Sequence, residues 1–150
     1  LEWLMWQMGG FGPMPGQAHH FIRYAPEGQD YGVARYGAEA ARLLAGMDAR
    51  LGEADYLAGE YSVADIAAWP WVRATYAIGL DLEPYPNVRR WVDAVGARPA
   101  VQRGVETRNA PNLQSRRPTL TPQQWSNLFG ENMHRSFGVT SPPADRDPRR

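Results

Sequence analysis

The stretch 60-EYSVADIAAWPWV-72 carries the strongest structural signal in the sequence. Ser62 is a favoured helix N-cap residue, and Asp65 stands three positions later, where its carboxylate can accept a hydrogen bond from the N-cap amide. This spacing predicts a capping box and therefore a helix that begins just after Ser62. Tyr61 and Ile66 have the spacing of a hydrophobic staple across the same helix start.

The helix that follows this cap is expected to be central in the fold. No charged side chain occurs between Asp65 and Arg73, and a helix that is apolar nearly all round is typically buried against several neighbours. Pro70 has no amide hydrogen to donate, so it predicts a kink.

Helical periodicity extends on both sides of this stretch. Residues 30–51 form the clearest amphipathic helix, with apolar residues at spacings of three and four, and residues 1–8 show a shorter apolar stripe. The second stripe consists of Leu1, Leu4, Met5 and Met8. Pro86 and Pro99 begin two further helices. Because no segment alternates with a period of two, we predict an all-α protein with a kinked first helix and a central buried helix.

The run 9-GGFGPMPGQAHHF-21 interrupts the first helix. A phosphate-binding loop is disfavoured, because the glycines follow a helix rather than a strand and the chain contains no lysine. A metal site is also disfavoured, because His19 and His20 are adjacent and would point about 100° apart on a helix. The remaining interpretation is a break or kink beside a small-molecule pocket.

The C-terminal part of the chain has a different composition. We expect the helical domain to span residues 1–108, followed by an extension over 109–137 and a disordered tail over 138–150. Within the extension, Thr121 and Gln124 predict a capping box for a short docking helix at about 122–129.

Composition excludes several classes of function. The 150 residues carry 16 basic and 16 acidic side chains, which does not suit a nucleic-acid-binding surface. There is no cysteine for a disulfide, a thiolate ligand or a cysteine nucleophile. No apolar run approaches the ~18 residues of a membrane span. The chain begins "LEWLMWQMGG", without an initiator Met, which we interpret as a fragment or as the C-terminal half of a larger protein. The absence of cysteine agrees with the cytoplasm as the expected location.

Arg35 has two possible roles when the residues alone are considered. It is four positions before Glu39, a spacing typical of a surface ion pair. It could instead be a fixed cation that faces a carboxylate or thiolate across a cleft. The first role is the simpler one.

Several motifs together resemble a known family. The stretch "SVADIAAWPW" resembles the folding motif of the glutathione transferase C-terminal helical domain, and "YPNVRRWVDAVGARPAVQRG" resembles the next helices of that domain. More narrowly, "WLMWQMGGFGPMPGQAHHF", "YAPE" and "YGVARY" resemble the bacterial Nu class, the glutathione-dependent disulfide-bond oxidoreductases.

The resemblance implies a role for specific residues. It implies that Arg35, in "YGVARY", lies near bound glutathione. It also implies a substrate pocket beside the Gly/Pro run, lined by Phe11, Met14, Gln17, His20, Phe21 and Tyr24. Catalytic groups are expected in an N-terminal thioredoxin-like domain that is absent here. Expected partners are glutathione, a disulfide or electrophilic small molecule and a second copy of the chain, with no metal, nucleic acid or membrane.

Two classes of function stay open at this point. The first is the substrate-side half of an enzyme that reduces or transfers disulfide bonds. The second is a non-catalytic helical interaction module, because the same domain is reused for assembly in other proteins.

Overall fold

The computed structural model describes residues 1–106, 120–130 and 132–135. The chain divides into two compact units, residues 1–117 and 118–150. The described residues are helical apart from turns and two isolated β-bridges between residues 56 and 60, so the predicted all-α class is confirmed. The predicted domain boundary at 108 and the tail at 138–150 fall outside the described residues.

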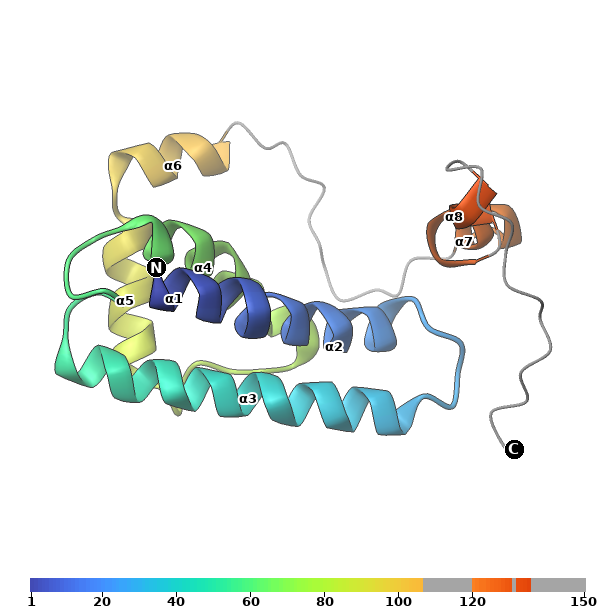
Figure 1. The fold of residues 1–150 in the computed structure, drawn as a ribbon, viewed down its shortest axis with the longest axis horizontal. Coiled ribbons are helices and arrows are strands. Elements are labelled where there is room, and N and C mark those ends of the chain that lie inside the picture. Colours follow the sequence, from blue (N-terminus) through green and yellow to red (C-terminus); the bar gives the residue numbers. More distant parts are fainter. Residues whose placement is uncertain (107–119, 131, 136–150) are drawn as a thin grey trace. The chain divides into compact units, whose positions relative to one another are not determined.

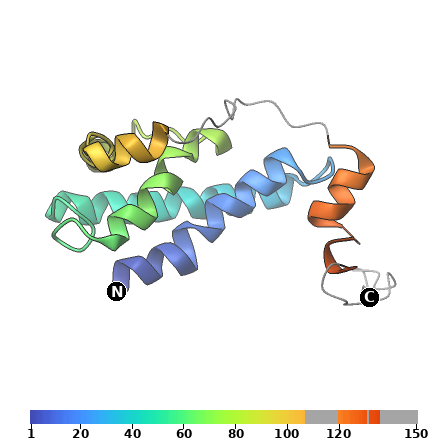
Figure 2. The same cartoon turned by 90° about the horizontal axis from the view of Figure 1, so that it is seen from above.

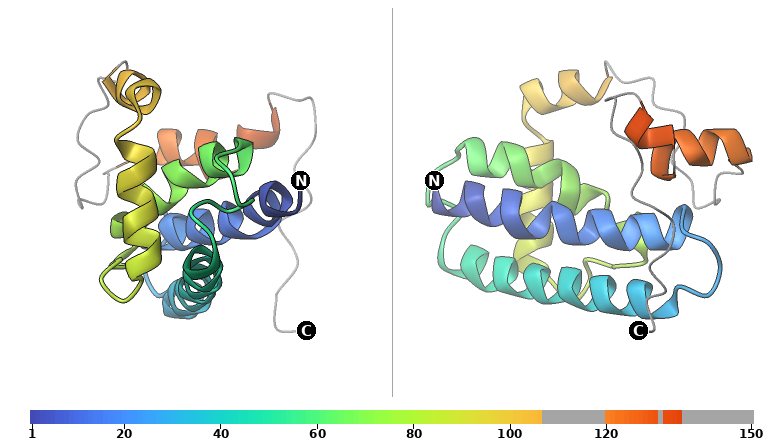
Figure 3. Two further views of the ribbon diagram at one scale, coloured as in Figure 1. Left: turned by 90° about the vertical axis from the view of Figure 1, so that its left-hand side faces the viewer. Right: turned by 45° about the vertical axis from the view of Figure 1, so that its right-hand side comes forward.

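The first unit contains six α-helices, one π-helix and one 3₁₀ turn among its described residues. They are α1 (Glu2–Trp6), η1 (Gln7–Phe11), α2 (Pro13–Arg23), α3 (Asp30–Glu53), α4 (Val63–Arg73), η2 (Thr75–Ile78), α5 (Pro86–Gly96) and α6 (Pro99–Glu106). The α1–α2 segment and α3 run antiparallel side by side (Figure 1), and α5 crosses the other helices (Figure 3).

The Gly/Pro run does not end the first helix. The chain passes from α1 through the π-helical turn η1 into α2, and Figure 2 shows the segment continuing in one direction. The Gly12 amide donates to the Gln7 carbonyl at 2.8 Å, five residues back, as in a π-helix. Pro13 fits because it occupies the first turn of α2. The predicted break is therefore wrong, and the predicted irregularity is a π-helical turn.

Close packing explains the glycines at two positions in this run. A Cβ at Gly12 would lie 2.7 Å from Nε2 of Gln7 and 3.4 Å from Cε2 of Trp71. A Cβ at Gly16 would lie 3.5 Å from the Trp71 ring. The α2 backbone can therefore approach α4 with the indole of Trp71 between them.

The predicted stripe on the long helix α3 forms much of the core. Its fully or nearly buried members are Ala40, Leu43, Leu44, Met47 and Leu51. All of these except Ala40 pack in one cluster with residues of α4 and α5, including Trp91. The helix prediction over residues 30–51 is confirmed.

Three of the four residues in the predicted stripe over residues 1–8 are exposed, and the fourth, Leu4, is partly buried against the core. Leu1, Met5 and Met8 are 96%, 55% and 59% exposed. Trp6 is instead partly buried against the core and stacks on Phe11 with ring centroids 5.4 Å apart. The large aromatic rings bury more apolar area than the Leu/Met stripe, so they determine which face of the helix turns inward.

The predicted capping box of Ser62 and Asp65 is present at the start of α4. The Ser62 amide donates to Oδ2 of Asp65 at 2.9 Å, and Oγ of Ser62 accepts from the Ala64 amide at 3.2 Å. Asp65 is fully buried, and its Oδ1 also accepts from the Leu57 amide and from Nε1 of Trp91, at 3.1 and 2.8 Å. One carboxylate thus connects α4, α5 and the loop before α4.

The helix α4 is buried on one face only. Ala64, Ala68 and Val72 face the core, whereas Val63 and Ile66 are more than half exposed. The predicted staple is wrong, because Ile66 points to solvent and Tyr61 packs against Tyr56 and the guanidinium of Arg98. The sequence pattern could not distinguish a helix surrounded by this unit from one with an exposed apolar face.

The second unit contains α7 (Pro122–Phe129) and α8 (Asn132–Arg135). The predicted capping box of Thr121 and Gln124 is present in both directions, at 2.9 and 3.2 Å. Trp125 and Phe129 meet edge to face on α7. No helix in the described ranges is both long and apolar enough to cross a bilayer.

Candidate functional site

Rings from the end of α2 and the start of α3 lie next to one another. His20 meets Phe21 edge to face at 5.7 Å and lies 6.2 Å from the ring of Tyr24. Phe21 stacks on Tyr36 of α3 with centroids 5.5 Å apart and an interplanar angle of 17°. His19 contacts Tyr24 at 5.7 Å. We call His19, His20, Phe21, Tyr24 and Tyr36 the ring cluster.

Gly32 allows the ring cluster to lie against α3. A Cβ at this position would lie 2.6 Å from two ring atoms of Phe21. The absence of a side chain therefore lets the Phe21 ring rest on the α3 backbone, one turn before Tyr36.

Arg35 is exposed and immediately precedes Tyr36 of the ring cluster. The simpler role considered for Arg35, an ion pair with Glu39, is not observed. Glu39 instead receives two hydrogen bonds from Arg42, at 2.8 and 2.7 Å, which lower the pKa of its carboxyl below the usual value. Within the described ranges Arg35 has neither a hydrogen bond nor an ion pair, so its guanidinium is available to a ligand.

The other predicted pocket residues are distributed unevenly. His20, Phe21 and Tyr24 come together in the ring cluster. Gln17 is exposed and Met14 is partly buried against the core, both earlier on α2. Phe11 has no exposed surface and belongs to the core, so its predicted place in the pocket wall is corrected here. The Trp6 stack holds it inward.

The imidazole of His19 lies in an environment that disfavours its charged form. Burial is the main cause that lowers the pKa of His19, and the positive charge of Arg23 and the neighbouring His20 add to it. Nε2 of His19 lies 3.4 Å from the Arg23 guanidinium. A neutral imidazole can accept a hydrogen bond there, whereas a protonated one cannot.

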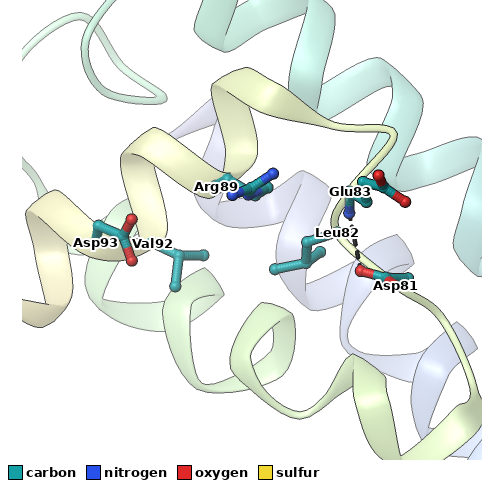
Figure 4. Close-up of a pocket in the computed structure, with 6 residues that line it drawn as sticks. All are labelled: Asp81, Leu82, Glu83, Arg89, Val92 and Asp93. Carbon is teal, nitrogen blue, oxygen red and sulfur yellow. Dashed lines mark hydrogen bonds between the residues drawn. The ribbon is translucent and has the colours of Figure 1, made fainter.

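Two of the surface hollows in the described ranges are lined neither by Arg35 nor by any of the predicted pocket residues. One, of about 500 Å³, lies between the 81–83 loop and α5 and is lined mostly by charged side chains, including Arg89 and Asp93 (Figure 4). The other, of about 340 Å³, lies between α1 and the start of α4. No group of three His, Asp or Glu side chains in the described ranges is placed to hold a metal ion.

Two residues that meet at Gly12 in the Gly/Pro run have surroundings that the sequence did not reveal. Gln7 is 3% exposed, and its Oε1 has no hydrogen-bond partner within the described ranges. Trp71 is 38% exposed and lies beside Gln7 across Gly12. A glutamine next to a glycine run gives no sequence signal of burial, so only the packing identifies it.

Comparison with known proteins agrees with this architecture. Residues 30–94 match the family described as glutathione S-transferase, C-terminal domain. The chain is 48% identical over 101 residues to disulfide-bond oxidoreductase YfcG of Escherichia coli (strain K12). This match covers 67% of this chain and 47% of that protein. It is 39% identical over 121 residues to disulfide-bond oxidoreductase YghU of the same strain, with 74% and 42% covered.

Solved structures of glutathione transferases are also similar to this chain. A glutathione transferase from Burkholderia graminis, with two glutathione molecules bound per subunit, matches with a TM-score of 0.65 and 38% identity, over 73% of this chain and 49% of that one. A Pseudomonas putida glutathione transferase with one glutathione disulfide per subunit matches with a TM-score of 0.64 and 38% identity, over 71% and 49%.

The helical fold and these matches define the class of protein. The first unit is a glutathione S-transferase C-terminal domain. The curated relatives named above are disulfide-bond oxidoreductases, and the chain spans about half their length.

Proposed function

We propose that this chain is the substrate-side helical half of a glutathione-dependent disulfide-bond oxidoreductase. The similarity to two proteins named as disulfide-bond oxidoreductases supports the reaction class. Solved relatives that hold glutathione or glutathione disulfide support glutathione as co-substrate. No metal is part of the proposal.

The observation that carries the proposal is the exposed Arg35, which stands one residue before Tyr36 of the ring cluster and whose guanidinium has no hydrogen bond or ion pair within the described ranges. A guanidinium favours a carboxylate or a thiolate, and its bond to an anion is stronger than one between neutral groups. Glutathione offers both anions. In this proposal Arg35 holds the tripeptide, while His20, Phe21 and Tyr24 form the adjacent wall with Met14 and Gln17.

The proposed reaction is thiol–disulfide exchange. A glutathione thiolate attacks one sulfur of the substrate disulfide, and the other sulfur leaves as a thiolate that takes up a proton. A second glutathione attacks the mixed disulfide. One disulfide is reduced to two thiols, and two glutathiones are oxidised to one glutathione disulfide. We assign activation of the thiol to residues outside this chain.

The assembly is also part of the proposal. A homodimer in the cytoplasm is expected from the resemblance. A second candidate function, a non-catalytic interaction module, is favoured by one observation, the exposed apolar side chains Leu1, Met5 and Met8 on one side of α1 and η1.

A turnover assay on the natural protein that contains this chain distinguishes the two functions. With glutathione and a small disulfide, the enzyme should form one glutathione disulfide per disulfide reduced, faster than the uncatalysed exchange. A rate equal to the uncatalysed rate at saturating glutathione would contradict the proposed reaction and favour the interaction module.

A further inference from the structure

Gln7 presents an unpaired hydrogen-bond acceptor in the interior of the first unit. The residue is 3% exposed, and its Oε1 has no partner within the described ranges. Buried polar atoms are nearly always paired, because an interior acceptor that loses its water without gaining a donor destabilises the fold. Such an exception requires a partner that these residues do not supply, which is either a ligand or a bound water.

The backbone around Gln7 is also unusual. Gln7 is the first residue of the π-helix η1, and its carbonyl accepts from the Gly12 amide at 2.8 Å. Single π-helical turns inside α-helices occur frequently at functional sites, because the wide turn redirects the side chains that follow. The π-turn is independent of the unpaired Oε1 and points to the same place.

Trp71 supplies an unpaired donor beside this acceptor. Its Cε2, the ring atom bonded to Nε1, lies against Gly12, where the Gln7 amide also lies, and the far edge of its ring lies against Gly16. The indole N–H is therefore at the Gln7 end of the ring. Within the described ranges this N–H has no acceptor, whereas those of Trp69 and Trp91 donate to the Val92 carbonyl and to Asp65.

We propose that Gln7 and Trp71 form a subsite for a secondary amide, the peptide bond of the thiol or disulfide substrate. The Trp71 N–H donates to the amide carbonyl, and Oε1 of Gln7 accepts the amide N–H. A secondary amide has one donor and one acceptor, which matches the two unpaired groups. The choice of a peptide substrate rests on the proposed function.

Glycines explain how an amide could enter. Oε1 of Gln7 is enclosed in the unliganded chain, and the other end of the same amide group, Nε2, lies at Gly12 beside Trp71. In this proposal the Trp71 ring rotates away from Gly12 to admit the ligand. Trp71 is already 38% exposed and covers glycine backbone rather than side chains at Gly12 and Gly16. Rotation of the Trp71 ring therefore disturbs little side-chain packing and exposes glycine backbone that a peptide backbone can approach closely.

The test is an NMR titration of this chain with N-methylacetamide, the smallest secondary amide, and with N,N-dimethylacetamide, which lacks the N–H. The indole N–H signal of Trp71, identified by its loss in Trp71→Phe, should move with N-methylacetamide while those of Trp69 and Trp91 stay in place. The shift per unit concentration should be about tenfold smaller with the dimethyl compound, because one of two hydrogen bonds is lost.

Two variants complete the test. Gln7→Met keeps the length of the side chain and removes the acceptor, so it should reduce the response to N-methylacetamide about tenfold and leave the dimethyl response unchanged. Gln29→Met, at an exposed position just before α3 that belongs to no proposed site, is the matched control and should behave as the parent.

Equal responses to the two amides on the parent chain would overturn the subsite, and this comparison does not depend on any variant folding. An unmoved Trp71 signal would overturn it as well, and would leave a bound water as the only partner of Gln7. The proposed function can fail separately from the subsite. If the natural protein shows no catalysed disulfide turnover while the amide response is as predicted, the proposed reaction is wrong and the amide subsite stands.

Discussion

Asp65 has a larger role in the structure than a helix cap. The sequence predicted its bond to the Ser62 amide from local spacing alone. Its bonds to the Leu57 amide and to the Trp91 indole depend on residues 8 and 26 positions away, which no local pattern encodes. A fully buried carboxylate requires such donors, because an unpaired charge in the interior is very costly. The burial of Asp65, once known, therefore implies that partners exist.

Replacement of Asp65 tests this network. Asp65→Ala leaves four donors without their acceptor, namely the Leu57 and Ser62 amides, the Ser62 hydroxyl and the Trp91 indole. We expect the free energy of unfolding to fall by about 3 kcal/mol or more. Asp93→Ala, on the exposed side of α5, is the control and should change it by less than about 0.5 kcal/mol. Denaturant melts of both variants measure the difference. A loss of only about 1 kcal/mol for Asp65→Ala would match a simple cap and contradict the network.

His19 should make stability depend on pH. Its folded-state pKa lies below the value in the unfolded chain, chiefly because the ring is partly buried, so the unfolded state binds more protons as pH falls. The contribution of neutral His19 to the free energy of unfolding is fully present above pH ~6.5 and is lost as the pH decreases below that value. His19→Gln should flatten the stability profile between pH 7.5 and 5, measured as thermal midpoints. An unchanged slope would contradict the assignment to His19.

At the scale of elements, the Gly/Pro run shows where sequence reasoning stops. Glycine and proline are helix breakers in general, and the run was predicted to break or kink the helix. The structure keeps it helical because Pro13 sits in a first turn and because Gly12 and Gly16 give Trp71 space against α2. That partner is more than fifty residues away, so the glycine pattern could be seen in the sequence but not explained from it.

Two glycines in this run provide a matched pair. Gly12→Ala places a methyl group 2.7 Å from Nε2 and 3.1 Å from the carbonyl of Gln7, and overpacking of this kind costs about 1–3 kcal/mol. Gly9 has no atom within 4 Å of its Cβ position, so Gly9→Ala should stabilise the helix by up to about 1 kcal/mol. Thermal midpoints should move in opposite directions. A shift of the same sign for both variants would contradict the packing described for Gly12.

At the scale of the whole molecule, burial was harder to predict than secondary structure. The helix class, the long helix α3 and both capping boxes follow from local patterns and are confirmed. The helix α4 was predicted to be buried nearly all round, yet Val63 and Ile66 on one side of it are exposed. An apolar pattern shows that a face is hydrophobic and not what covers it. For the candidate site, the sequence indicated three members of the ring cluster and missed Gln7 and Trp71.

The isolated chain should not act alone on glutathione. We assign the groups that activate the thiol to residues outside this chain, so it should neither catalyse disulfide exchange nor bind glutathione at sub-millimolar concentration. Isothermal titration calorimetry measures this directly. Tight stoichiometric binding of glutathione to the 150-residue chain would show that the assignment of roles between the two halves is wrong.

The central claim is that Arg35 faces glutathione on the substrate side of a disulfide-bond oxidoreductase. The most direct measurement is kcat/KM for disulfide reduction by the natural protein that contains this chain, compared with its Arg35→Ala variant. We expect a loss of about tenfold or more, since a charge-assisted contact contributes ~1.5–3 kcal/mol. Arg35→Lys should recover part of it, because lysine offers a point charge in place of a planar fork. Arg89→Ala, which removes an exposed arginine of α5 away from any predicted pocket residue, should keep the parental value. Parental kinetics in Arg35→Ala would contradict the claim.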